Sequence, residues 1–252
     1  MHNDILTIGP FTIHGYGLMI AIGILVGMHL AEKSARANGL SDSHTDNIVY
    51  TALVAGWASS KLTYILINLK DFLADPMSFL SSSGWVVFGG LLGGILGGYL
   101  YCRIRKIEFR EYFNLIIPYV ALAQAFGRVG CFLAGCCYGI ETTLPIGVVF
   151  PAGSLAVPGV KLLPTQLFSA LGDFCLFLIL RKTYRNKDTR YKTGAMYLIL
   201  YSFGRFMIEF IRGDVARGFI GVFSTSQFIS LFTFAAGIIL FVLLSRKENK
   251  TV

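Results

Sequence analysis

Seven long apolar runs follow one another along the chain, and they restrict it to a membrane fold. The runs lie at about residues 11–31, 48–67, 85–101, 113–134, 164–180, 194–211 and 223–244. Most reach the ~17–25 residues that a helix needs to cross a hydrocarbon core about 30 Å thick. Lipid offers the backbone no hydrogen-bond partners, so each run must satisfy its own groups as a helix.

Composition supports the same fold class. Only 14% of the residues are charged and 54% are hydrophobic, whereas an average soluble domain has about 25% charged residues. A soluble helical bundle would also need polar outer faces, which these runs lack. We therefore expect an all-α polytopic membrane protein with about seven transmembrane helices, folded as a single transmembrane domain over residues 1–252. Residues 1–10 contain Asp4 but no Lys or Arg, so the first run is expected to be a retained helix and not a cleaved signal.

The distribution of positive charge predicts the orientation. Of the 22 Lys and Arg residues, most lie in alternate connections: Lys33, Arg36, Arg103, Arg105, Lys106, Arg110, Arg181, Lys182, Arg185, Lys187, Arg190, Lys192, Arg246, Lys247 and Lys250. The opposite connections hold Lys70, Lys161 and Arg217. The positive-inside rule therefore predicts an N-out, C-in topology. Because the net charge of +8 lies in short inner loops, we expect contacts with membrane lipids and no nucleic-acid partner.

Two segments interrupt this pattern. Residues 139–163 hold three of the seven prolines and cannot form one continuous helix, so we expect a Pro/Gly-rich outer loop that serves as a cap or a lateral gate. Seven glycines fall between residues 84 and 98. They predict close helix packing, although Gly89 and Gly90, nearer the outer end, could instead let a ligand touch the backbone.

Six ionisable residues lie inside the apolar runs, where charge is costly and therefore indicates function. They are Lys61, Arg128, Asp173, Arg205, Glu209 and Arg212. Arg205 and Glu209 share a helix face at i,i+4 spacing, and Arg212 continues the stripe. One interpretation is an ion-pair network that locks helices together. The other is an anion site, because three arginines outnumber one glutamate and guanidinium groups bind phosphate in a bidentate way. In a membrane, that phosphate would belong to a phospholipid head group.

Three of the five cysteines, Cys131, Cys136 and Cys137, are clustered in the sequence. The odd total and the placement near apolar runs argue against a disulfide framework. Cysteine also packs well as a small apolar side chain. Three interpretations stay open for the cluster: packing, a disulfide switch, or a metal site, for which the spacing is unfamiliar and no fourth ligand is evident.

Several motifs, taken together and in order, resemble the prolipoprotein diacylglyceryl transferase family. The likeness extends from about residue 8 to the last apolar run. Its strongest parts are IGPFTIHGYGLM at 8–19, FGGLLG at 88–93, GRVGCF at 127–132, LPTQLF at 163–168 and GRFMIEFIRGD at 204–214. The resemblance implies a bacterial inner-membrane enzyme, with its active site toward the outer leaflet, that acts on the signal peptides of prolipoproteins.

The resemblance also implies a reaction and roles for residues. The family moves the diacylglyceryl group of phosphatidylglycerol to a lipobox cysteine thiol and releases glycerol-1-phosphate, without a metal or an organic cofactor. Arg128 and Arg205 would hold the lipid phosphate, Glu209 would orient Arg205, and Tyr16 and Gly139 would line the site. The substrate-binding set implied in this way is Arg128, Arg205, Gly89, Gly90, Gly139, Gln166 and Arg212.

The chain departs from the family pattern at polar positions. Phe88 stands where the glycine-rich motif usually begins with histidine, Cys131 and Cys136 replace an asparagine and a glutamate, and Leu162–Leu163 occupy a place where histidine is common. His14, two residues before Tyr16 in the first predicted helix, then becomes the candidate base. Alternatively, the substrate thiol loses its proton to water or to the surrounding positive charge.

Two other functions remain open at this stage. One is a divergent phospholipid-dependent transferase that uses a different acceptor on the same scaffold. The other is a non-enzymatic lipid or solute carrier. The two halves of the chain share no motif, which argues against an inverted-repeat transporter.

Overall fold

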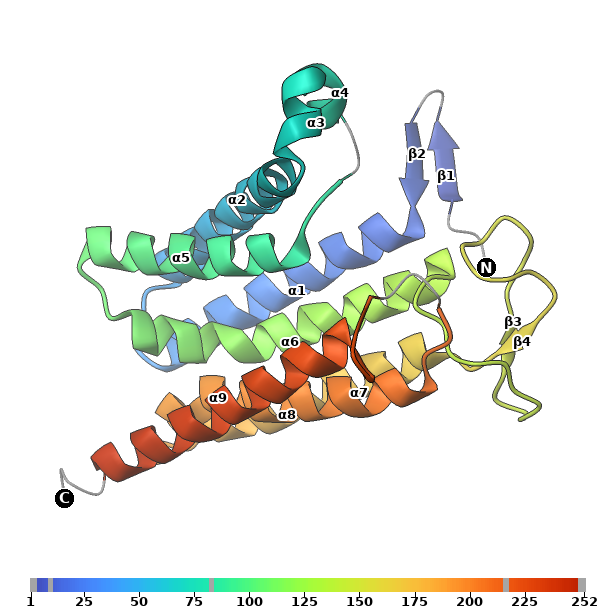
Figure 1. Cartoon of the computed structure of the whole chain (residues 1–252). Coiled ribbons are helices and arrows are strands. Elements are labelled where there is room, and N and C mark those ends of the chain that lie inside the picture. Colours follow the sequence, from blue (N-terminus) through green and yellow to red (C-terminus); the bar gives the residue numbers. More distant parts are fainter. Residues whose placement is uncertain (1–3, 9–10, 82–83, 215–217, 249–252) are drawn as a thin grey trace. The chain divides into compact units, whose positions relative to one another are not determined.

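The structure, a computed structural model, describes residues 4–8, 11–81, 84–214 and 218–248. It divides into two compact units (Figure 1). Unit 1 lies within Met1–Leu30 and Phe113–Val252, and unit 2 is Ala31–Tyr112. The expectation of a single domain over residues 1–252 stays a prediction.

Each of the seven apolar runs contains a long helix, as predicted. The long helices are α1 (Gly15–Ala37), α2 (Asp42–Ile67), α5 (Val87–Arg105), α6 (Phe109–Ala134), α7 (Thr165–Arg185), α8 (Thr193–Ile208) and α9 (Thr225–Glu248). The short ones are α3 (Leu69–Ala74), α4 (Pro76–Ser81) and the 3-10 turns η1 (Arg190–Lys192) and η2 (Glu209–Ile211). Within the described residues, five helical stretches are long and apolar enough to cross a membrane: α1, α5, α6, α9 and the stretch from η1 through α8 to η2. The chain is therefore a polytopic membrane protein.

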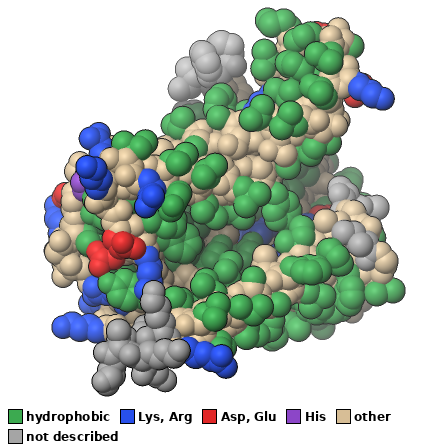
Figure 2. Space-filling view, turned by 60° about the vertical axis from the view of Figure 1, so that its left-hand side comes forward, with side chains coloured by type: hydrophobic (Ala, Val, Ile, Leu, Met, Phe, Trp, Pro, Cys, Tyr) green, Lys and Arg blue, Asp and Glu red, His purple; other side chains and the backbone are tan. Residues whose placement is uncertain are grey.

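The surface has the character expected of a protein embedded in lipid. Apolar side chains cover much of the face seen in Figure 2. Large ones are strongly exposed on several helices, for example Leu25 (67%), Val54 (68%), Leu92 (69%) and Phe232 (63%). Soluble monomers rarely expose apolar patches larger than a few hundred Å², so these faces are suited to hydrocarbon.

The first helix begins later than predicted. Strand β1 (Asp4–Ile8) pairs antiparallel with β2 (Phe11–His14), and α1 starts only at Gly15. The prediction that residues 11–14 are helical is therefore wrong. The physical reason is local: Phe11, Thr12 and Ile13 are residue types that favour strands, and a paired neighbour satisfies their backbone groups. His14 consequently ends a strand and does not lie inside a helix.

In unit 2, glycines bring α5 against α2. A Cβ atom added at Gly97 would lie 2.6 Å from the Cβ of Ala55, and one added at Gly90 would lie 3.2 Å from the carbonyl oxygen of Gly56. Only small residues allow such an approach. This close packing was predicted for the glycine-rich segment.

In unit 1, α6 contacts both α7 and α8 (Figure 1). The ring of Tyr119 lies 5.9 Å from that of Phe177 on α7. The Asn114 side chain accepts a hydrogen bond of 2.9 Å from the backbone N–H at the start of α8. Helices α8 and α9 are joined by a hydrogen bond of 2.6 Å between the hydroxyls of Ser202 and Thr233. Unit 1 is thus a helical layer held by polar contacts as well as by apolar ones.

The segment 139–163, called the cap below, is folded, and its role as an outer cap or a lateral gate stays a prediction. Strands β3 (Val148–Val149) and β4 (Lys161–Leu162) pair antiparallel. Phe150, Ala156 and Leu162 form a small core, against which Phe132 and Tyr138 pack. The predicted absence of a continuous helix over this segment is confirmed.

Candidate active site

Three charged residues gather where α8 ends. Arg205 lies on the last turns of α8, Glu209 opens η2, and Arg212 follows it. One carboxylate oxygen of Glu209 lies 3.0 Å from Nη2 of Arg205 and 3.5 Å from Nη1 of Arg212. Arg205 also donates a hydrogen bond of 2.8 Å to the hydroxyl of Ser226 on α9. The pairing of Arg205 with Glu209 follows from their i,i+4 spacing, as the sequence indicated.

Arg212 has a second acidic partner. Its Nε and Nη2 donate to the two carboxylate oxygens of Asp214 at 2.9 and 2.5 Å, which is a bidentate pair. Burial works to lower the pKa of Arg212, but the hydrogen bond and charge of Asp214 outweigh it and raise that pKa. The backbone of Arg212 pairs with Gly139, so the cap holds this arginine in place.

Arg128 approaches the same region from α6. Its Nε lies 4.0 Å from a carboxylate oxygen of Asp173 on α7. The guanidinium is 23% exposed and the carboxylate 10% exposed. At this distance the pair is a loose ion pair and not a tight hydrogen bond.

The charge balance differs from the expectation that positive charge is in excess. Asp173, Glu209 and Asp214 supply three carboxylates to match three arginines. Sequence reasoning omitted Asp214 because it lies beyond the helix, although it closes the quoted motif at 204–214. Arg212 and Asp214 meet because the backbone at Arg212 is extended (φ −76°, ψ 140°), which side-chain periodicity along a helix does not anticipate.

A cavity of about 420 Å³ opens between α6, α7 and α8. Arg128, Asp173 and Arg205 are its charged lining residues, so its wall carries a net positive charge although the whole cluster is balanced. Glu209 is buried behind Arg205 and does not line the cavity. The other walls are largely apolar and come from α7 and α8: Phe168, Leu176, Ile179, Leu200, Met207 and Ile208. Tyr201, which sequence reasoning missed, also lines it.

A second cavity, of about 450 Å³, is almost wholly apolar. It lies between α1, α6 and α7 and is lined by Met19, Val26, Leu30, Leu122, Ala125, Phe126, Val129, Ala170, Phe174 and Phe177. A cationic cavity and a separate apolar cavity in one unit match the two chemical parts of a phospholipid, the phosphate and the acyl chains.

Gly139 and Gln166, both expected to bind substrate, are buried in packing contacts. The N–H of Gly139 donates to the carbonyl of Leu163 at 2.8 Å, and an added Cβ would lie 2.8 Å from the carbonyl oxygen of Ile211. Gln166 is 1% exposed and donates from Nε2 to the carbonyl of Cys136 at 2.8 Å. Neither residue is among those lining the two cavities. A role in substrate binding stays a prediction for both.

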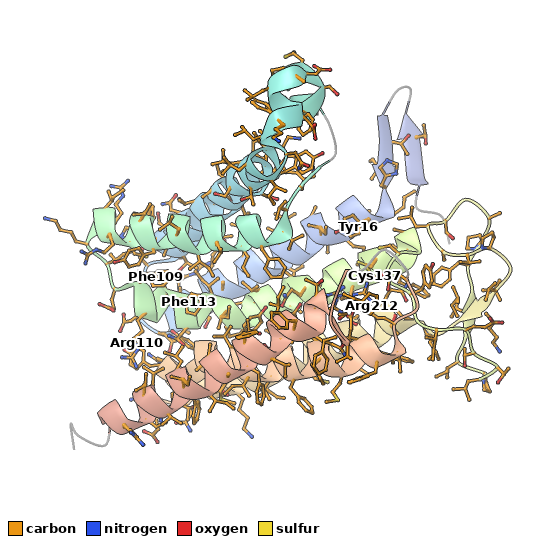
Figure 3. The ribbon with its side chains drawn as sticks, in the orientation of Figure 1. Tyr16, Phe109, Arg110, Phe113, Cys137 and Arg212 are labelled. Carbon is orange, nitrogen blue, oxygen red and sulfur yellow. The ribbon has the colours of Figure 1, made fainter. Side chains whose placement is uncertain are left out.

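Tyr16 and His14 lie at the beginning of the chain, close to each other in sequence. Tyr16 is 41% exposed and packs over Gly130 of α6. Figure 3 shows Tyr16, Cys137 and Arg212 at the same end of unit 1. His14 is exposed at the end of β2, opposite Asp4 in the strand register. Their catalytic roles stay predictions.

Gly89 and Gly90 belong to unit 2 and pack against α2. A Cβ at Gly89 would collide with the side chain of Thr63, and one at Gly90 would approach Gly56 and Ser60. Helix packing therefore accounts for both glycines. The presence of glycine at these two positions does not require a contact with substrate, and that contact stays a prediction.

Comparisons with known proteins find relatives over almost the whole chain. The model of the prolipoprotein diacylglyceryl transferase family matches residues 3–243. A phosphatidylglycerol–prolipoprotein diacylglyceryl transferase of Clostridium tetani is 41% identical over 230 residues, which cover 91% of this chain and 92% of the relative. One of Clostridium perfringens, numbered 2, is 43% identical over 241 residues (94% and 93%), and one of Clostridioides difficile is 34% identical over 250 residues (96% and 97%). The chain belongs to the prolipoprotein diacylglyceryl transferase family.

Proposed function

We propose that this enzyme transfers the diacylglyceryl group of phosphatidylglycerol to the lipobox cysteine in the signal peptide of a prolipoprotein and releases glycerol-1-phosphate. The observation that supports this function most directly is the cavity that Arg128 and Arg205 line together with apolar residues of α7 and α8. In this cavity, a phosphate could contact two guanidinium groups between helices α6, α7 and α8. The names of the relatives specify the same lipid and the same class of acceptor.

In the proposed reaction, the substrate thiolate attacks a carbon of the lipid glycerol. A carbon–sulfur bond forms while the bond from that carbon to the phosphate oxygen breaks, and the leaving phosphate takes the electron pair. Charge accumulates on this phosphate, so contacts with Arg128 and Arg205 strengthen in the transition state. Arg128 is available because its pair with Asp173 is loose.

Glu209 serves as a positioning residue in this scheme. Its carboxylate lies 3.0 Å from Nη2 of Arg205, and Glu209 itself is not among the residues that line the cavity. The lipid phosphate therefore meets the positive face of Arg205 and not the carboxylate. Arg212, which is paired with both Glu209 and Asp214, supports this arrangement from the cap side.

We propose that the positive charge of Arg128 and Arg205 promotes loss of the proton from the substrate thiol. Positive charge next to a thiol favours its ionised form. The proposed proton acceptor is His14, at the exposed end of β2, or else water.

We further propose seven membrane spans in an N-out, C-in topology in the bacterial inner membrane, with the cavity toward the outer leaflet. Helices α2 and α7, with 26 and 21 residues, complete the set of spans. The uneven distribution of Lys and Arg supports the orientation. A reporter fused after Val252 should read cytoplasmic, and one inserted near Ala152 in the cap should read external. An external signal at the C-terminus would overturn the topology.

The test of the phosphate site replaces arginine by lysine, which keeps the charge but loses the planar fork. We expect Arg128→Lys and Arg205→Lys each to lower kcat/KM at least tenfold, which is about 1.4 kcal/mol. Arg185→Lys, at the exposed end of α7, is the matched control and should behave as wild type. Arg212→Lys, outside the cavity, should have a milder effect than either cavity variant.

The assay is turnover of phosphatidylglycerol with a lipobox peptide, read by mass, on purified protein shown to be folded. Near-normal turnover of both cavity variants would refute the phosphate site. Glycerol phosphate release with an acceptor other than the lipobox cysteine would refute the acceptor assignment but keep the site.

A further inference from the structure

The cysteines 131, 136 and 137, here called the thiol cluster, have no part in the proposed reaction. Their sulfur atoms all lie within 4.8 Å of one another. The three thiols are free, and they are at most partly exposed. Such a convergence of sulfurs within seven residues requires a structural cause.

The cause is the way α6 ends. The N–H of Cys136 donates to the carbonyl of Cys131 at 3.1 Å, and the N–H of Gly135 donates to the carbonyl of Phe132 at 3.3 Å. Gly135 has φ +74°. These two bonds around a left-handed glycine are a Schellman motif, which places the residue after the glycine against the residue five positions earlier. Cys131 and Cys136 therefore meet because of the helix cap.

Cys137 completes the cluster in an unfavourable backbone conformation. Its φ is +60°, which costs a non-glycine residue about 1–2 kcal/mol. The surrounding structure holds this conformation: the hydroxyl of Thr165 donates to the carbonyl of Cys137, and Gln166 donates to that of Cys136, both at 2.8 Å. Strain that is held in place in this way motivates a hypothesis of function.

We propose that Cys131, Cys136 and Cys137 form a three-thiolate binding site for a thiophilic d10 metal cation, Zn²⁺ or Cu⁺. Soft thiolate ligands select these metals. With metal–sulfur bonds of about 2.3 Å, three sulfurs lie about 4.0 Å apart around a trigonal Cu⁺ and about 3.8 Å apart around a tetrahedral Zn²⁺, whose fourth ligand would be water. Rotation of the side chains needs to move each sulfur by less than about 1 Å to reach this spacing. The backbone of Cys136 and Cys137 is already held by hydrogen bonds from α7.

The electrostatic surroundings suit such a complex. Each thiol that becomes a ligand releases its proton to solvent. Three thiolates with Zn²⁺ then carry one net negative charge, and with Cu⁺ two. Arg212 lies near the cluster, because its backbone pairs with that of Gly139, two residues after Cys137, so the anionic complex has a cationic neighbour.

The test is direct metal binding by the full-length reduced protein in lipid nanodiscs. Zn²⁺, or Cu⁺ under anaerobic conditions with a competing chelator, is added, and the metal retained per chain is measured by elemental analysis. Cd²⁺ serves as a spectroscopic stand-in through its thiolate charge-transfer absorption. We expect one metal per chain, with at least tenfold weaker binding when any cluster cysteine is replaced by serine.

Cys175→Ser is the matched control, because Cys175 is an exposed thiol outside the cluster, and it should bind metal as wild type does. Equal loss of binding in Cys175→Ser, or no retained metal in the wild type, would overturn the proposal. A mass lower by two hydrogens and two fewer reactive thiols in the freshly isolated protein would overturn it in favour of a disulfide pair. The readout is independent of transferase activity, so it fails or succeeds separately from the proposed function.

Discussion

Neutralising Glu209 is the change whose consequences the structure specifies most closely. Its side chain is 1% exposed, and one of its oxygens serves both Arg205 and Arg212. In Glu209→Gln, Arg212 keeps its bidentate partner Asp214, but Arg205 keeps only the hydroxyl of Ser226. The variant therefore leaves one buried guanidinium without an opposite charge next to it.

The size of the effect follows from the burial of the pair. Removing one partner of a fully buried ion pair costs about 3–5 kcal/mol. Arg205 is 16% exposed at a cavity wall, so solvent compensates part of this cost, and glutamine still offers an oxygen. We expect a loss of about 2 kcal/mol. If this loss falls on the positioning of Arg205, kcat/KM falls about thirtyfold at ~1.4 kcal/mol per factor of ten.

A matched control lies elsewhere in the same chain. Glu32 and Arg36 have the same i,i+4 spacing at 3.3 Å, but the arginine is 59% exposed. Exposed pairs contribute at most about 1 kcal/mol, so Glu32→Gln should change neither thermal unfolding nor turnover appreciably. Thermal unfolding in detergent and turnover are measured on both variants. Equal behaviour of Glu209→Gln and Glu32→Gln would refute the reasoning that burial makes this pair important.

Three further predictions concern the ends and contacts of α6. Replacing all three residues of the thiol cluster by serine should leave most turnover in metal-free protein, and a loss above about a hundredfold, or ~2.7 kcal/mol, would place the thiols in the chemistry itself. Gly135→Ala should destabilise the protein by more than the ~1–2 kcal/mol of left-handed strain, because the new Cβ would lie 2.8 Å from that of Ser154; an unchanged unfolding temperature would contradict this. Asn114→Ala should cost about 1–3 kcal/mol, because it leaves the buried N–H of Gly194 without its acceptor, and hydrogen exchange at that amide should rise.

The candidate site was only partly predictable, for a reason that individual residues make clear. Arg205 and Glu209 could be paired from spacing alone, because a helix brings i and i+4 together whatever surrounds it. The pairing of Arg128 with Asp173 could not, because the two residues belong to different helices whose packing joins them. The prediction that positive charge is in excess in this cluster was wrong for the same reason. Three arginines were counted against Glu209 alone, whereas two further carboxylates come from α7 and from the extended backbone after η2.

In the thiol cluster, too, one contact could be predicted from the local sequence and another could not. The Ala-Gly-Cys sequence at the end of α6 contains the signal for a left-handed helix cap, which brings Cys136 back to Cys131. The position of Cys137 depends on Thr165 and Gln166 of α7, far along the chain. Spacing alone therefore favoured packing and left a disulfide switch and a metal site as alternatives.

The sequence by itself determined the membrane class, the positions of the seven helices and the family, because apolar length, backbone hydrogen bonding within a helix and linear motifs are local properties. It also predicted that Arg128 and Arg205, which lie on α6 and α8, bind a phosphate. Only the tertiary structure decided that residues 11–14 form a strand with Asp4–Ile8, that Gly139 and Gln166 are buried in contacts between the cap and its neighbours, and that Arg128 and Arg205 line one cavity. These outcomes depend on contacts between segments distant in sequence, and no local pattern specifies which of several possible partners a side chain will meet.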